Sequence, residues 1–80
     1  MRVQVIVRLK NGVLDPQGKA IENALQSLEY NNVSNVRQGK IIELNINDDD
    51  KDAVIKQAHA MAEKMLANTV MEDFSIHIVE

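Results

Sequence analysis

The side chains that could carry out acid-base, nucleophilic or metal chemistry are few and scattered in this sequence. It contains two histidines, His59 and His77, and neither has a second histidine or a cysteine at a spacing that binds a metal. The serines, Ser27, Ser34 and Ser75, have no neighbouring base in the sequence. These spacings indicate that the histidines and serines are solvated or lie in an interface, and do not form a catalytic site.

Three short patterns resemble ligand-binding loops, and each lacks a required part. The three aspartates at 48–50 offer carboxylates for calcium, but an EF-hand loop also needs alternating ligands, a glycine and a terminal glutamate. Lys40 after Gly39 lacks the upstream glycine and the downstream serine or threonine of a phosphate-binding loop. Gly12 and Gly18 have the wrong spacing for a dinucleotide fingerprint. The sequence thus favours an interaction or regulatory domain without an active site of its own.

The composition predicts one small domain over residues 1–80. A chain of 80 residues with 45% hydrophobic content can build one core but not two. A net charge of −3, a pI near 5.3 and only one tyrosine and one phenylalanine argue against nucleic-acid binding, which uses basic patches and aromatics. Because the chain starts with alternating polar and apolar residues, we expect neither a signal peptide nor a membrane span, and therefore a cytoplasmic location.

The first half of the chain predicts a strand, a loop and a helix. Apolar residues alternate with polar ones over residues 2–10, as in a strand with one buried face. Asp15 and Pro16 are typical of a helix start, and Gly18 in the first turn suggests close approach of another backbone or of a partner. We expect the helix to end near the asparagines at 31 and 32 and to pack an apolar stripe against the core: Ile21, Ala24, Leu25 and Leu28.

The second half predicts three further strands and a second helix. A hairpin is expected from strands at 33–37 and 41–46, joined by a turn that depends on Gly39. The aspartates at 48–50 then start a helix, and Asn68 is expected to end it. We expect the buried face of this helix to carry Val54, Ala58, Met61, Ala62 and Met65, and the last strand to alternate Phe74, Ile76 and Ile78 with polar residues.

The order β-α-β-β-α-β predicts an α+β fold of the ferredoxin-like type, a two-layer sandwich with two helices on one face of a four-stranded, largely antiparallel sheet. The first and third strands are expected at its centre. The second face of the sheet would be a mixture of apolar and polar residues, and we expect that face or a sheet edge to mediate self-association: Gln4, Ile6, Arg8, Ile41, Glu43, Ser75, His77 and Val79.

Three stretches, which together span nearly the whole chain, resemble the PurS family, the small subunit of bacterial phosphoribosylformylglycinamidine synthase. They are Leu9-Lys10-x-Gly12-Val13-Leu14-Asp15-Pro16-Gln17-Gly18-x-Ala20-Ile21, then Val36-Arg37-x-Gly39-Lys40-x-Ile42-Glu43-Leu44, and Glu63-Lys64-Met65-Leu66-Ala67-Asn68 with Val70, Glu72 and Asp73 behind it. The chain departs from the family pattern at Glu29, where glycine is usual, so we expect the first helix to run slightly further. It departs again at Thr69, where proline is common.

The resemblance implies a non-catalytic subunit that binds no cofactor itself. It implies a synthetase subunit of the PurL type, which uses ATP and magnesium, and a glutaminase subunit of the PurQ type as partners. The complex converts formylglycinamide ribonucleotide to the amidine in purine biosynthesis, with glutamine as nitrogen source. The implied role is to bridge the two catalytic subunits so that ammonia passes between them. A homodimer or higher homo-oligomer, without nucleic acid or membrane partners, goes with this expectation.

Exposed loops are the expected partner contacts, because connecting segments lie on the surface and glycine permits close backbone approach. The contact residues that we expect are Lys10, Asn11, Gly12, Val13, Leu14, Gly18, Arg37, Gly39 and Lys40. Two other functions remain open at this point. A ferredoxin-like module that binds a small regulatory ligand is one, and a saturable shift of melting temperature with an amino acid or nucleotide would reveal it. An RNA-binding domain is the other, although it should expose aromatics on its central strands.

Overall fold

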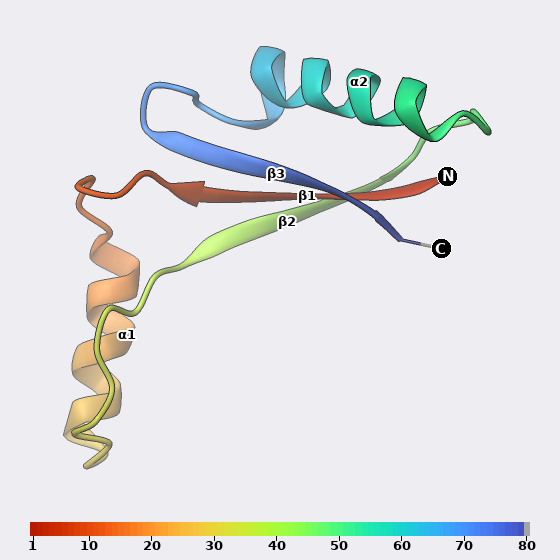
Figure 1. Ribbon diagram of the computed structural model, residues 1–80. Coiled ribbons are helices and arrows are strands. Elements are labelled where there is room, and N and C mark those ends of the chain that lie inside the picture. The colour runs from red at the N-terminus through yellow and green to blue at the C-terminus, as the bar shows by residue number, and fades with distance from the viewer. Residues whose placement is uncertain (80) are drawn as a thin grey trace.

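The computed structural model describes residues 1–79 as a three-stranded antiparallel sheet with one helix packed on a face and a second helix projecting from one end (Figure 1). In chain order the elements are β1 (Arg2–Leu9), α1 (Pro16–Ser27), β2 (Gly39–Asn45), α2 (Lys51–Met61), the π-helical turn η1 (Ala62–Leu66) and β3 (Glu72–Val79). The α+β class that the sequence predicts is therefore observed.

The core lies between the sheet and α2. The strand order is β2-β1-β3, so β1 is central, and Val5 pairs with Ile42 on one side and Ile76 on the other. Three valines of β1 point toward α2 and are almost completely buried, as their alternation predicts: Val3, Val5 and Val7. Opposite them, α2 and η1 bury Val54, Ala58 and Ala62.

The expected hairpin and fourth strand are absent from the described residues. Residues 33–37 form no strand, and Gly39 begins β2 instead of forming a hairpin turn. Asn35 has a left-handed φ of 55°, which interrupts an extended run. Side chains of α1 also satisfy backbone groups of this segment, since the Val36 N–H donates to Glu22 and the Val33 carbonyl accepts from Gln26. The predicted third strand is consequently an edge strand here, not a central one.

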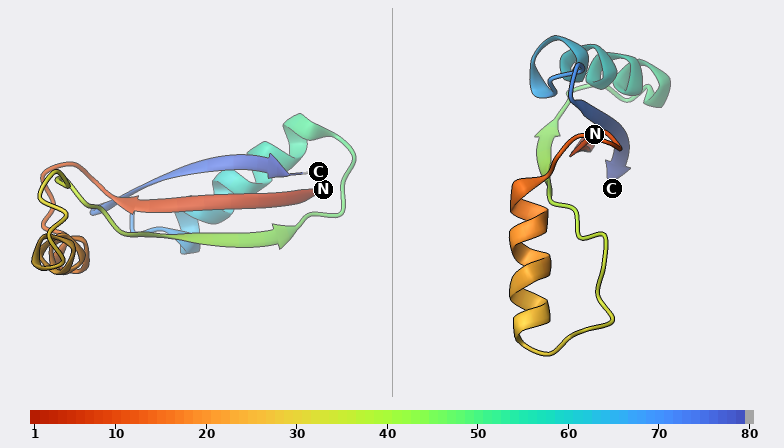
Figure 2. Two further views of the ribbon diagram at one scale, coloured as in Figure 1. Left: turned by 90° about the horizontal axis from the view of Figure 1, so that it is seen from below. Right: turned by 90° about the vertical axis from the view of Figure 1, so that its left-hand side faces the viewer.

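Helix α1 projects away from the sheet instead of covering it (Figures 1 and 2). The stripe that the sequence places in the core is largely exposed, with Ile21 at 40% and Leu28 at 67% of full exposure. The Cα radius of gyration is 15.8 Å, whereas a compact chain of this length would have about 12 Å. The prediction that α1 packs on its own sheet was wrong, because helical periodicity shows that a helix has an apolar face but not which surface covers it.

Helix α1 ends at Ser27, earlier than expected. Leu28 caps it, and Glu29 has a left-handed φ of 73°, while the Tyr30 N–H reaches back to the Leu25 carbonyl. This is the backbone geometry of a helix stop that usually selects glycine. Glu29 adopts it despite its side chain, so the expected extension of the helix was wrong.

The second helix begins where the aspartates predict, with the Asp50 side chain accepting the Asp52 N–H. Its predicted buried face changes at η1. There the Ala67 N–H bonds to the Ala62 carbonyl, an i to i+5 spacing that shifts the following residues around the axis. As a result Ala67 is buried and Met65 is 83% exposed. Met61, the residue before this turn, is also exposed, so the predicted buried face is confirmed at Val54, Ala58 and Ala62 and was wrong at both methionines.

Candidate partner-binding site

The residues expected to contact partners gather at the junction between the sheet and α1. The loop 10–14 follows β1 and contains a turn in which the Val13 N–H donates to the Lys10 carbonyl. The Lys10 N–H donates to the Met71 carbonyl, which connects the loop to the turn before β3. Gly12 has a φ of +87°, as its position in the loop requires, and no atom lies near where a Cβ would be. Leu14, the last residue of this loop, is 78% exposed.

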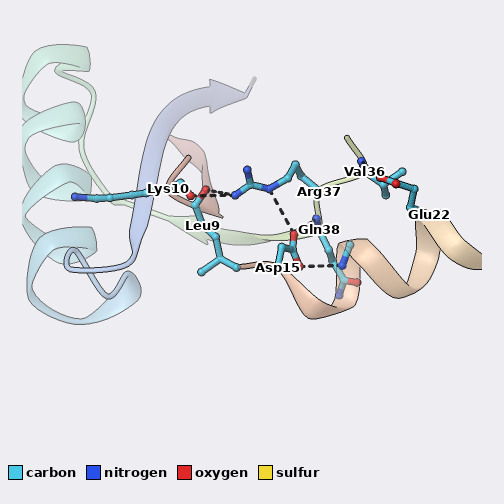
Figure 3. A network of polar contacts seen from close by, with 8 residues as sticks. Leu9, Lys10, Asp15, Glu22, Val36, Arg37 and Gln38 are labelled. Atoms are coloured by element: carbon cyan, nitrogen blue, oxygen red, sulfur yellow. Dashed lines mark hydrogen bonds and ion pairs between the residues drawn. The ribbon is translucent and has the colours of Figure 1, made fainter. Parts of the chain in front are cut away.

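Asp15 is the centre of this junction (Figure 3). Its Oδ1 accepts the Gly18 N–H at 2.8 Å, the expected N-cap, and its Oδ2 accepts the Gln38 N–H at 2.8 Å. The Arg37 Nε lies 3.6 Å from the same Oδ2, and the Arg37 Nη2 donates to the carbonyls of Leu9 and Lys10 at 2.8 and 3.1 Å. One carboxylate and one guanidinium therefore join the end of β1, the start of α1 and the start of β2.

A second set of contacts holds the returning segment along α1. Glu22 accepts the Val36 N–H at 3.2 Å and pairs with Lys19 at 3.3 Å. The close approach that Gly18 predicts is made within the chain, because a Cβ there would lie 2.4 Å from the Val36 carbonyl oxygen. We call α1 together with residues 28–38 the arm, since these contacts make the helix and the returning segment one unit (Figure 2).

Two open hollows flank the junction. One of about 330 Å³ is lined on its polar side by Arg8, Gln17, Lys40 and Glu72. The other, of about 430 Å³, is lined by residues 12–15 of the loop and by Lys19, Glu22 and residues 35–37. Six of the expected contact residues line one of these hollows, Gly39 and Lys40 the first and Gly12, Val13, Leu14 and Arg37 the second. Lys10 borders a further hollow beside His59. Gly18 is buried and Arg37 is engaged within the chain, so the accessible members are the loop 10–14 and the start of β2 at Gly39 and Lys40.

The two histidines lie apart from this junction. His59 Nδ1 is 2.9 Å from Glu63 Oε1, and its ring meets Phe74 edge-on at a centroid distance of 5.0 Å. His77 Nε2 is 2.9 Å from Ser75 Oγ on the face of the sheet opposite α2. Among residues 1–79 no group of three metal-binding side chains comes together. The geometry at the junction is suited to holding a surface in shape, and offers no nucleophile with an adjacent base.

The carboxylates at the junction should make the folded chain less stable at acid pH. The Gln38 and Gly18 N–H groups, with help from Arg37, hold the pKa of Asp15 below its usual 3.8, and the Val36 N–H with Lys19 does the same for the pKa of Glu22. Both carboxylates have a lower pKa in the folded chain than in the unfolded chain. Their contribution is therefore complete above about pH 4 to 5 and is lost as the pH falls through their folded pKa values.

We expect Asp15→Asn to lower the melting temperature at pH 7 by about 5 °C or more, because the amide has one acceptor oxygen and cannot serve both N–H groups. The deficit should shrink as the pH falls below the usual aspartate pKa of 3.8 and the wild-type carboxyl loses its charge. Thermal melts of both chains across pH 2.5 to 7 check this, with Asp49→Asn, an exposed aspartate in the loop before α2, as the control. A deficit that stays constant over that range would contradict the role of the Asp15 charge.

Sequence reasoning identified Asp15 as a helix cap but missed its bond to Gln38, and it missed Glu22 and Gln26 altogether. Their i, i+4 spacing was a signal that they share one side of α1. What that side contacts is set by the path of residues 28–38, which local pattern does not reveal.

The comparisons with known proteins agree with one another. A family model, PurS, described as phosphoribosylformylglycinamidine (FGAM) synthase, matches residues 2–80. The phosphoribosylformylglycinamidine synthase subunit PurS of Bacillus subtilis is 49% identical, over 99% of this chain and 93% of its own length. The crystal structure of Methanocaldococcus jannaschii PurS, one of the subunits of formylglycinamide ribonucleotide amidotransferase, aligns with a TM-score of 0.85 at 36% identity and covers 99% of this chain and 98% of that one.

A chain in the structure of PurLQS from Thermotoga maritima is also similar. It aligns with a TM-score of 0.88 at 26% identity and covers 98% of this chain and 95% of that one. Within residues 1–79, no helix has the length and apolar character needed to cross a bilayer.

Proposed function

The chain belongs to the PurS family, and from this premise we propose that it is the small, non-catalytic subunit of phosphoribosylformylglycinamidine synthase. The match over residues 2–80 carries this proposal, because it includes the loop, the helix start and the arm as well as the sheet. The similarity to a chain of PurLQS supports this function over the alternative of a small-ligand regulatory module. In this role the chain assembles with a synthetase and a glutaminase subunit in purine biosynthesis, and a cytoplasmic location goes with it.

The proposed role is bridging. Ammonia released into water at neutral pH is mostly protonated and is then useless as a nucleophile, so its transfer between two active sites needs a protected path. A subunit that holds two larger proteins in register can provide that path without catalysing a step. ATP and magnesium then belong to the synthetase subunit, and this chain binds neither.

The residues that would contact the two larger subunits are the accessible ones at the junction. Leu14 offers an exposed apolar side chain at the end of the loop. Lys40 adds charge at the first hollow and Lys10 at the hollow beside His59. Exposed charges of this kind set orientation and association rate more than affinity. The Asp15 and Arg37 contacts would keep the loop and the start of β2 in a fixed relation, which lowers the entropy cost of binding.

Reconstitution tests this function. The chain is mixed with purified synthetase and glutaminase subunits, and amidine formation is followed with glutamine or with ammonium as nitrogen donor. We expect the glutamine-driven rate to fall at least roughly 100-fold when the chain is omitted, while the ammonium-driven rate needs only the synthetase. A chain with Leu14→Asp should restore less glutamine-driven activity than the wild type, and Val70→Asp, equally exposed in the loop before β3, serves as the control.

If omission of the chain changed neither rate, the bridging role would be wrong. The regulatory-module alternative would then be tested by melting the chain in the presence of amino acids and nucleotides, since a ligand that binds the folded chain raises its melting temperature.

A further inference from the structure

The first hollow of the junction, of about 330 Å³, carries positive charge that the chain itself does not use. Arg8 at the end of β1 and Lys40 at the start of β2 both line it, and both side chains are exposed. Within residues 1–79, neither of them takes part in an ion pair. Two cations therefore border one hollow without a partner from the described part of the chain.

The two acids that line the same hollow do not cancel this charge. Asp15 uses both oxygens for backbone N–H groups and lies 3.6 Å from the Arg37 Nε, so that its charge is balanced by Arg37. Glu72 accepts the Asn68 N–H at 2.7 Å, which holds its carboxylate toward the turn before β3. Two positive charges then stand against one negative charge, so the hollow is positive although the whole chain has a net charge of −3.

The glycine at position 39 directs Arg8 toward this hollow. In the sheet, Arg8 lies between Gly39 on β2 and Asp73 on β3. A Cβ at position 39 would lie 2.8 Å from the Arg8 Cγ, so the stem of the arginine occupies the space above the glycine. Arg8 therefore leans toward the start of β2, and in residues 1–79 it makes no ion pair with Asp73.

The other hollows of the junction lack such a surplus. In the second hollow, each cation is paired with an acid that lines the same hollow. In the hollow beside His59, one lysine and one histidine share the lining with Glu72 and Asp73. The unused positive charge is thus a property of the first hollow and not of the junction as a whole.

We propose that the first hollow binds a carboxylate side chain from an acidic segment of a partner protein. This inference rests on the proposed function, which gives the synthetase and the glutaminase subunits as the partners. It assigns a chemistry to the contact: the Arg8 guanidinium and the Lys40 ammonium donate to the carboxylate, and a guanidinium can donate to both carboxylate oxygens at once.

The form of the hollow favours a protein segment over a small anion. Its remaining walls are largely apolar, with Val7, Leu9 and Pro16 among them, and it is open to solvent on one side. A small phosphate compound would stay in contact with water there, and exposed ion pairs contribute little to binding. A protein segment covers the hollow with its own surface, so that the ion pairs are shielded from water and the methylene groups of the acidic side chain meet the apolar walls.

Such a contact would act mainly on association. Salt screens exposed charges over about 8–10 Å at physiological ionic strength, so an acidic segment near the hollow is attracted by Arg8 and Lys40 more than it is repelled by distant acids. Charges at the edge of an interface raise the association rate and fix the orientation of the partners. The contact should therefore weaken as the salt concentration rises.

The test is a titration of the reconstituted enzyme. Purified synthetase and glutaminase are held constant, the chain is added stepwise, and the chain concentration that gives half of the full glutamine-driven rate is measured. Arg8→Gln and Lys40→Gln should each raise this half-saturating concentration by roughly 10-fold at about 50 mM salt, and by less at about 300 mM. Lys40→Arg keeps the charge and should stay within about threefold of the wild type.

Matched controls separate the hollow from charge in general. Arg2→Gln changes an exposed arginine on the same face of β1 at its other end, and Lys64→Gln changes an exposed lysine of η1. Each should change the half-saturating concentration by less than about twofold. Thermal melts and sedimentation of every variant verify that its fold and its self-association match those of the wild type.

The proposal would be overturned if Arg8→Gln and Lys40→Gln behaved like the two controls, or if their effects were as large at high salt as at low salt. Inorganic phosphate is the probe for a small-anion site. Saturable shifts of the Gly39 and Lys40 amide signals in NMR spectra, with a dissociation constant below about 1 mM, would also overturn it. If the wild-type chain restores glutamine-driven activity and the hollow variants do so equally well, this inference alone fails. A wild-type chain that restores none contradicts the proposed function itself.

Discussion

Gly18→Ala is expected to destabilise the chain by about 2 kcal/mol, although alanine is the better helix former by about 1 kcal/mol. The added Cβ would lie 2.4 Å from the Val36 carbonyl oxygen and 2.7 Å from Asp15 Oδ2. The carbonyl is backbone, and the segment that carries it is bonded to α1 at Val36 and at Gln38. It cannot move aside without breaking those bonds, so the arm should open.

Urea denaturation followed by circular dichroism measures this change in the free energy of unfolding. Gln17→Ala, one position earlier and exposed, is the control and should be neutral or slightly stabilising. Gly12→Ala provides a second comparison, because its cost of about 1 kcal/mol comes from the left-handed φ and not from a clash. A Gly18→Ala chain as stable as the Gln17→Ala chain would show that the returning segment does not pack on α1 in solution.

Val5→Asp is expected to abolish folding. Val5 is completely buried at the centre of the middle strand, in a core cluster whose buried members are all alanine, valine or isoleucine. Their side chains offer no hydrogen bond or positive charge. An unpaired carboxylate in such a site either costs several kcal/mol as an ion or must take up a proton, and a small domain has little stability to lose. Circular dichroism and proton NMR should show an unfolded chain at pH 7.

The neighbouring residue supplies the control for this core substitution. Gln4→Asp adds the same side chain one position away, where it faces the outer side of the sheet and pairs with Glu43. The like-charge pair costs at most about 1 kcal/mol, so this chain should fold. If both variants folded equally well, the assignment of the two faces of β1 would be wrong.

Much of this protein is determined by its local sequence. The alternation in β1 and β3, the Asp15 cap and the start of α2 each follow from interactions within a few residues, and they are seen as predicted. The motifs that resemble PurS could also be recognised from the sequence, because the match depends on the order of the residues along the chain and not on their positions in space.

The tertiary structure decided three further features. The sequence of residues 33–37 is suited to a strand, but the Val36 N–H in this segment bonds to a side chain of α1 instead of to a neighbouring strand. Met65 is suited to the core by its spacing, but the π-helical turn rotates it toward the surface. The apolar stripe of α1 was predicted correctly as a stripe and wrongly as part of the chain's own core. Periodicity reports which side of an element is apolar, whereas the surface that covers that side depends on contacts between residues far apart in the chain, and in an oligomer on another copy.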